Sequence, residues 1–79
     1  MLKSPYELVA EALGCRPETL RPDSGLNNHP MWDSFGQLNV MMALEENYGV
    51  PVDDDSIRAH QGMAGILKTY ETLTSDAGR

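Results

Sequence analysis

The sequence predicts an all-α fold, a small helical bundle of three main helices plus a short helix. The first indication is composition: the 79 residues are 41% hydrophobic but only 6% aromatic, and few are β-branched, a balance that favours helices over sheet. The second is a set of apolar residues that recur at helical spacing between start and stop signals. A chain of this length allows a single domain, which we expect to span residues 1–79.

The first main helix is predicted over residues 5–13. Ser4 and Glu7 have the spacing of a capping box, and Pro5 suits the first helical position because its missing N–H costs nothing there. Gly14 is a natural stop.

A long loop is predicted next, over residues 15–32. This segment contains three prolines and an Asn-Asn pair, which break helices and form turns. Its length suggests either a function or a short turn hidden within it. We expect four apolar side chains to hold it against the core: Leu20, Leu26, Met31 and Trp32.

The second main helix is predicted from a cap at Asp33 to about Tyr48, with Gly49 as its stop. A short helix is expected around residues 54–59, because the three acids at 53–55 suit a helix N-terminus. The third main helix is predicted over 62–73. The ordered part should therefore run from about residue 3 to 73, with a frayed tail at 74–79.

The charge balance excludes several classes of partner. Twelve acids and six bases give a net charge of −6, which disfavours nucleic acid and anionic membranes and favours basic protein surfaces.

One cysteine, Cys15, forms no internal disulfide, and no apolar run approaches the ~20 residues of a membrane span. The N-terminal residues lack the apolar core of a signal peptide. We therefore expect a cytoplasmic protein without membrane insertion, and a monomer.

The apolar residues of the second helix cover a wider arc of its surface than one buried face would need. Two explanations remain open: all of them belong to the core, or a second face is exposed as a docking strip flanked by carboxylates. Residues 33–55 contain six acids and no Lys or Arg, which favours a surface for a basic partner. On a helical wheel, the first face holds Val40, Met41, Leu44 and Tyr48, and the second holds Phe35, Leu38 and Met42.

The same helix resembles that of acyl carrier proteins, and the family pattern extends over nearly the whole chain. The resemblance rests on Trp32-Asp33-Ser34-Phe35, Leu38, Met42-Ala43-Leu44-Glu45-Glu46 and Tyr48-Gly49. An Asp-Ser pair alone carries no weight, but the Ala-Leu-Glu-Glu run, the length and the acidic balance make the combination specific.

The resemblance implies a non-catalytic carrier, not an enzyme. Ser34 would receive a covalent 4′-phosphopantetheine from coenzyme A through a phosphopantetheinyl transferase, making the chain a phosphoprotein. The arm would hold an acyl or aminoacyl group as a thioester. Asp33 would cap the helix and help the transferase engage. The implied partner interface comprises Phe35, Leu38, Met42, Glu45 and Glu46, read by a loading ligase and by downstream transferases with basic docking patches.

Some residues depart from the family pattern. Phe35 replaces the usual Leu, Met31-Trp32 stands where a Gly followed by a small residue is common, and Gly36, Gln37 and Asn39 are uncharged where fatty-acid carriers have acids. These departures favour a specialised biosynthetic pathway over housekeeping fatty-acid synthesis. The missing acids, together with the bulky Phe35 and Met41, also favour a short or polar cargo over a long chain folded between the second and last helices, against residues such as Val40, Leu44, Ile66 and Leu67.

The same residues fit other functions less well. Only His29 and His60 could act as a base for Ser34, and histidines are more typical of surface and loop positions than of triads. Cys15 and the histidines match no zinc spacing, and the acids at 53–55 lack the rest of a calcium loop, so no metal site is expected. Trp32 is either a core anchor or part of a partner interface. The main rival function is an unmodified helical interaction module that uses the same face.

Overall fold

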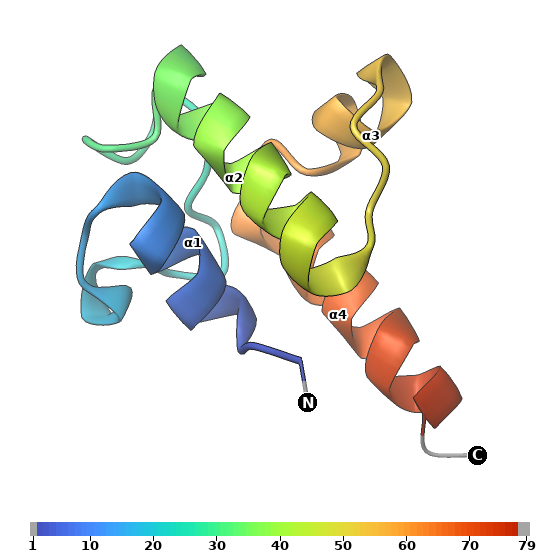
Figure 1. Ribbon diagram of the computed structural model, residues 1–79. Coiled ribbons are helices and arrows are strands. Elements are labelled where there is room, and N and C mark those ends of the chain that lie inside the picture. The colour runs from blue at the N-terminus through green and yellow to red at the C-terminus, as the bar shows by residue number, and fades with distance from the viewer. Residues whose placement is uncertain (1, 78–79) are drawn as a thin grey trace.

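The computed structural model describes residues 2–77 and confirms the all-α fold class (Figure 1). Helices α1 and α2 lie against each other, and α4 completes the bundle with them. The elements in chain order are α1 (Pro5–Leu13), the 3-10 helix η1 (Pro17–Thr19), α2 (Ser34–Tyr48), α3 (Asp54–Ala59) and α4 (Met63–Ala77).

Local signals explain the ends of α1 and α2 and the start of α3. Gly14 and Gly49 end α1 and α2 in the left-handed conformation, at φ 75° and 71°, where an L side chain would be strained. Asp53 caps α3 by accepting from the Ser56 N–H at 2.8 Å. The predicted capping box at Ser4 is wrong: Ser4 occupies the cap position, but its side chain makes no cap hydrogen bond.

The loop between α1 and α2 contains η1, the short turn that its length suggested, and is tied to the start of α4. An isolated antiparallel bridge joins Gly25 to Gly62. A Cβ on Gly25 would lie 2.8 Å from the Gln61 carbonyl oxygen, so this close approach requires glycine. The bridge brings the loop and the last helix together, although they are far apart in sequence.

Of the four apolar residues predicted to hold this loop, three do so. Leu20 and Trp32 are buried, and Leu26 packs against the core. The prediction is wrong for Met31, which is 46% exposed. Its neighbour Trp32 takes the buried position instead, and Met31 faces outward.

One hydrophobic core lies between the three main helices. Its largest fully buried side chains are Leu8, Val9, Trp32, Val40, Met41, Leu44, Met63 and Ile66. Tyr48 closes the far end of this core: its ring centroid lies 5.8 Å from that of Tyr70 on α4, and its hydroxyl donates to the Lys3 carbonyl oxygen at 2.6 Å.

Helix α4 is longer than predicted. It continues from Leu73 to Ala77, so the segment expected to fray is helical over residues 74–77. Residues 78 and 79 of that tail lie outside the described part of the chain. The Thr74 hydroxyl donates to the Tyr70 carbonyl oxygen at 2.9 Å, one turn back, which satisfies this polar side chain without ending the helix.

Candidate functional site

Three Asp-Ser pairs occur in the chain, and the structure separates them. Ser24 is buried, and its hydroxyl oxygen accepts from the Arg21 backbone N–H at 2.9 Å. Ser56 is half-buried in the six-residue helix α3. Ser34 alone is exposed, and it is the first residue of the fifteen-residue helix α2. Only Ser34 therefore combines an accessible hydroxyl with the N-terminus of a long helix.

Asp33 fixes the backbone on which Ser34 stands. Its carboxylate accepts from the Gly36 N–H at 2.8 Å, and its carbonyl oxygen accepts from the Gln37 N–H at 2.8 Å. These bonds leave the first N–H groups of α2, those of Ser34 and Phe35, for a ligand. The Ser34 hydroxyl makes no hydrogen bond with any side chain or backbone group of residues 2–75. A phosphate attached there would meet free donors and the positive end of the helix dipole.

A buried hydrogen-bond network holds the start of α2 in place. Trp32 is fully buried, and its indole N–H donates to Gln37 Oε1 at 2.7 Å. The Gln37 amide donates in turn to the His60 carbonyl oxygen at 3.1 Å. Trp32 is therefore a core anchor two residues before Ser34, which excludes the alternative that it lies at a partner interface.

His60 belongs to the same network and has no catalytic geometry. It lies in the connection between α3 and α4, as expected for a loop residue, but it is buried. Its Nδ1 is 2.7 Å from the Ser56 carbonyl oxygen and its Nε2 is 2.7 Å from Thr69 Oγ1. Both ring nitrogens are thus engaged in linking α3 to α4, and neither faces Ser34 as a base.

Gln37 was not predicted as a structural residue, although the sequence carries a signal for it. Gln37 precedes Val40, Met41 and Leu44 by three, four and seven positions, which places it on the buried face of the helix. A polar side chain on that face needs partners. The hydrogen-bond partners of Gln37 are the Trp32 side chain, in the preceding loop, and the His60 carbonyl oxygen, just after α3. No local pattern in the sequence identifies these partners.

The second apolar face of α2 is exposed. Phe35 is 73% exposed, Leu38 50% and Met42 52%, so the alternative that every apolar residue of α2 is core is wrong. Glu45 and Glu46 are exposed beside them. We name these five residues the α2 face; their role as a partner interface remains a prediction.

The α2 face has a single sign of charge. Among the described side chains, those of residues 2–75, the ion pairs are Lys3–Glu11 and Arg58–Asp55, at 2.7 and 3.1 Å. Neither pair involves Glu45 or Glu46, so both carboxylates stay available to a basic partner. Exposed charges in this position affect association more than folding.

No metal cluster and no membrane span accompany this site. In the described part of the chain, no three His, Cys, Asp or Glu side chains are grouped closely enough to hold a metal ion. Among residues 2–77, no helix has the length and apolar character to cross a membrane.

Comparison with known proteins shows a similarity to an acyl carrier protein. The chain is 28% identical over 67 residues to an acyl carrier protein from Sulfurovum sp. (strain NBC37-1), and the match covers 85% of this chain and 89% of that protein. Neither a family model nor a solved structure matches the chain. A similarity of this extent supports a carrier protein role in general.

Proposed function

We propose that this protein is an acyl carrier protein whose prosthetic arm, 4′-phosphopantetheine, is attached to Ser34. The observation that carries the proposal is the position of Ser34, the one exposed serine of the three Asp-Ser pairs, on the first turn of α2. The similarity to an acyl carrier protein over 85% of the chain supports it independently.

The residues around Ser34 suit a phosphodiester. The exposed hydroxyl offers the attachment atom, and the N–H groups of Ser34 and Phe35 can donate to phosphate oxygens. Asp33 holds the turn through its bond to the Gly36 N–H. When bound, the arm supplies a terminal thiol that holds the cargo as a thioester. The protein itself presents this thioester and performs no reaction on it.

Partners of two kinds follow from this function. A phosphopantetheinyl transferase modifies Ser34, and Asp33 contributes to its recognition. A ligase that loads an acyl or aminoacyl group, and transferases that remove it, bind the α2 face with basic patches of their own. The setting is a biosynthetic pathway in the cytoplasm. Phe35 and the uncharged Gln37 and Asn39 favour a specialised pathway.

The decisive experiment is loading from coenzyme A with a phosphopantetheinyl transferase of broad specificity. The wild-type chain should gain the mass of one phosphopantetheine, and Ser34→Ala should gain none. The matched control is Ser56→Ala, because Asp55-Ser56-Ile57 repeats the pattern of an Asp-Ser pair followed by an apolar residue. That variant should load like wild type.

Circular dichroism keeps this experiment interpretable. Ser34 is exposed and contributes little packing, so Ser34→Ala should retain the helical signal. Loading that persists in Ser34→Ala would move the attachment site to another residue. A wild-type chain that gains no mass under conditions that load a known carrier would instead support the unmodified interaction module.

A further inference from the structure

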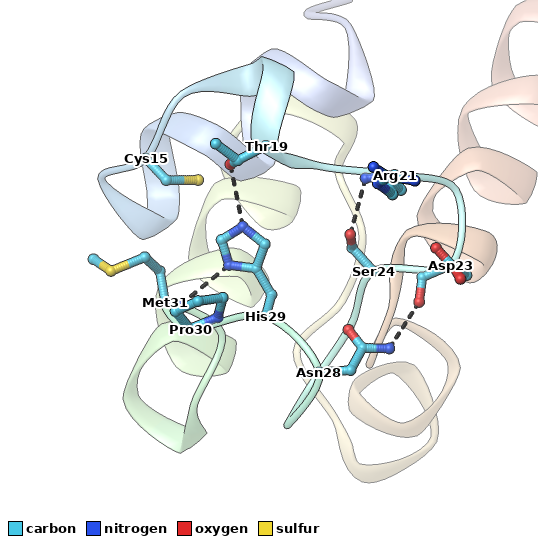
Figure 2. A pocket seen from close by; sticks show the side chains of 9 residues that line it. All are labelled: Cys15, Thr19, Arg21, Asp23, Ser24, Asn28, His29, Pro30 and Met31. Carbon is cyan, nitrogen blue, oxygen red and sulfur yellow. Dashed lines mark hydrogen bonds between the residues drawn. The ribbon is translucent and has the colours of Figure 1, made fainter.

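A hollow of about 530 Å³ lies in the loop between α1 and α2, outside the helical core (Figure 2). Its volume is within the usual range for small-ligand sites. Six of its nine lining residues are polar. Nothing in the attachment of an arm to Ser34 accounts for this loop hollow.

Internal hydrogen bonds hold the walls of the loop hollow. His29 lies at its centre in Figure 2, where Nδ1 accepts from the Met31 N–H and Nε2 lies 3.1 Å from Thr19 Oγ1. Asn28 accepts from the Gly25 N–H at 2.6 Å and donates to the Asp23 carbonyl oxygen at 2.8 Å. These hydrogen bonds give the loop a defined conformation.

Two charged side chains that line the loop hollow take no part in these hydrogen bonds. With the described side chains of residues 2–75, neither the Arg21 guanidinium nor the Asp23 carboxylate makes an ion pair or a hydrogen bond. In Figure 2 they lie on one side of His29, and Cys15 and Met31 lie on the other. The hollow thus offers one donor group and one anionic group at the end away from Met31.

A smaller hollow lies next to the loop hollow, beside the attachment site. It encloses about 260 Å³ and is lined by Asp33 and Phe35, the two neighbours of Ser34. Pro30 and Met31 line both hollows. Met31 is half-exposed, and a flexible methionine adapts readily to a passing group. An arm on Ser34 therefore has a course over Met31 into the loop hollow.

Between α2 and α4 the core side chains are closely packed. Val40, Leu44 and Ile66 are fully buried there, so a chain that entered would have to displace packed side chains. An arm in the loop hollow would displace only solvent.

We propose that the loop hollow shelters the thioester end of the arm together with a short aminoacyl cargo. The inference rests on the proposed function. Arg21 donates to the thioester carbonyl oxygen, and Asp23 accepts from the α-ammonium group. The net charge of −6 also favours an ammonium-bearing cargo over a carboxylate-bearing one. A long alkyl chain in the same place would cost free energy by desolvating both charged groups.

Disulfide trapping tests whether the arm reaches the loop hollow. Intact mass first establishes that the arm is attached, so a failure of the proposed function is recognised before this step. Oxidised glutathione is then added to the arm-bearing protein. The arm thiol and the Cys15 thiol should join in an intramolecular disulfide, with loss of two hydrogens and release of two reduced glutathione molecules.

The matched variant places the single thiol on the other side of α2. Ile57 on α3 is half-buried, as Cys15 is, so Cys15→Ser/Ile57→Cys presents a thiol of similar exposure. Its intramolecular disulfide should form roughly tenfold more slowly, because the effective concentration of the arm is lower there. Equal or faster formation in the variant would overturn the proposed location of the arm.

A second measurement tests the cargo. When an alanyl group is loaded onto the arm, the backbone amide resonances of Thr19, Asn28 and Met31 should shift. In the Asp23→Asn variant, the alanyl thioester should hydrolyse several-fold faster than in wild type. Hydrolysis of the octanoyl thioester should be the same in both proteins. Three results would overturn the proposal: amide shifts confined to Val40, Leu44 and Ile66, a succinyl cargo protected better than alanyl, or a melting temperature raised several degrees by octanoylation alone.

Discussion

Asp33 has a structural role as a helix cap and a proposed role in transferase recognition, and substitution can separate the two. Its carboxylate caps α2 through the Gly36 N–H at 2.8 Å, and it stands beside the exposed Ser34. Asp33→Ala removes the cap and should lower the free energy of unfolding by about 1 kcal/mol. Asp33→Asn retains an oxygen acceptor and should leave stability nearly unchanged. Both variants lose the charge, so both should be loaded more slowly from coenzyme A.

Urea denaturation and the initial rate of loading measure the two roles. If Asp33→Asn is loaded as fast as wild type while Asp33→Ala is slow, the aspartate serves only as a cap, and the transferase does not read its charge.

At this scale, the residues that the sequence predicts well are those with local chemistry. Asp33 could be predicted as a cap because its partner is three residues away. The glycine stops at Gly14 and Gly49 are equally local. The hydrogen bond between Trp32 and Gln37 could not be predicted, because either side chain has several other polar groups within reach in a folded chain. The loop hollow was missed for the same reason, since its walls meet only after the loop has folded.

At the scale of the helix, the α2 face makes a prediction about association. Glu45 and Glu46 are exposed and belong to no ion pair within residues 2–75. Glu45→Lys and Glu46→Lys should slow association with a basic partner enzyme, with little change in stability. Association of the wild type should also weaken as salt is added, because the Debye length is ~8 Å at physiological ionic strength.

Glu71→Lys is the matched control, because Glu71 is exposed on α4 and makes the same change in net charge. Loading rates across a salt series compare the three variants. A slowing in Glu71→Lys equal to that in the α2 variants would show that total charge, and not the α2 face, governs association.

Helix α2 also shows where periodicity stops being informative. Apolar side chains surround most of its circumference, so spacing alone left two arrangements open. The one-signed charge from 33 to 55 favoured the exposed face, and the 73% exposure of Phe35 decides it. The length of α4 was underestimated for a related reason. Thr74 is a weak helix former that ends the apolar pattern, but backbone hydrogen bonds continue to Ala77.

At the scale of the whole molecule, the contacts that unite distant segments had no sequence signal. The Gly25–Gly62 bridge joins the loop to the start of α4, and each glycine alone reads only as a turn residue. The fold class was nevertheless predictable, because it depends on the number and order of helices. The arrangement of the helices depends on such pairings, which form between surfaces far apart in the chain.

Tyr48 makes contacts of this long-range kind, and its ionisation leads to a prediction about the pH dependence of stability. Its hydroxyl joins α2 to the N-terminal segment through the Lys3 carbonyl oxygen at 2.6 Å, and its ring lies against Tyr70. Burial, with a smaller contribution from Tyr70, raises the pKa of Tyr48 from 10.0 to about 12. The folded state therefore favours the neutral phenol. This contribution to stability is fully present below pH 10 and is lost as the pH rises from 10 to 12.

Tyr48→Phe should show both consequences. Loss of the hydrogen bond to Lys3 should lower the free energy of unfolding at pH 7 by about 1 kcal/mol. Between pH 10 and 12 the stability of this variant should decline less steeply than that of wild type, because the phenol that titrates is gone. Tyr6→Phe is the control, since the Tyr6 hydroxyl makes no hydrogen bond within residues 2–75. Urea denaturation at a series of pH values measures all three proteins, and equal slopes in wild type and Tyr48→Phe would show that Tyr48 ionises alike in the folded and unfolded chain.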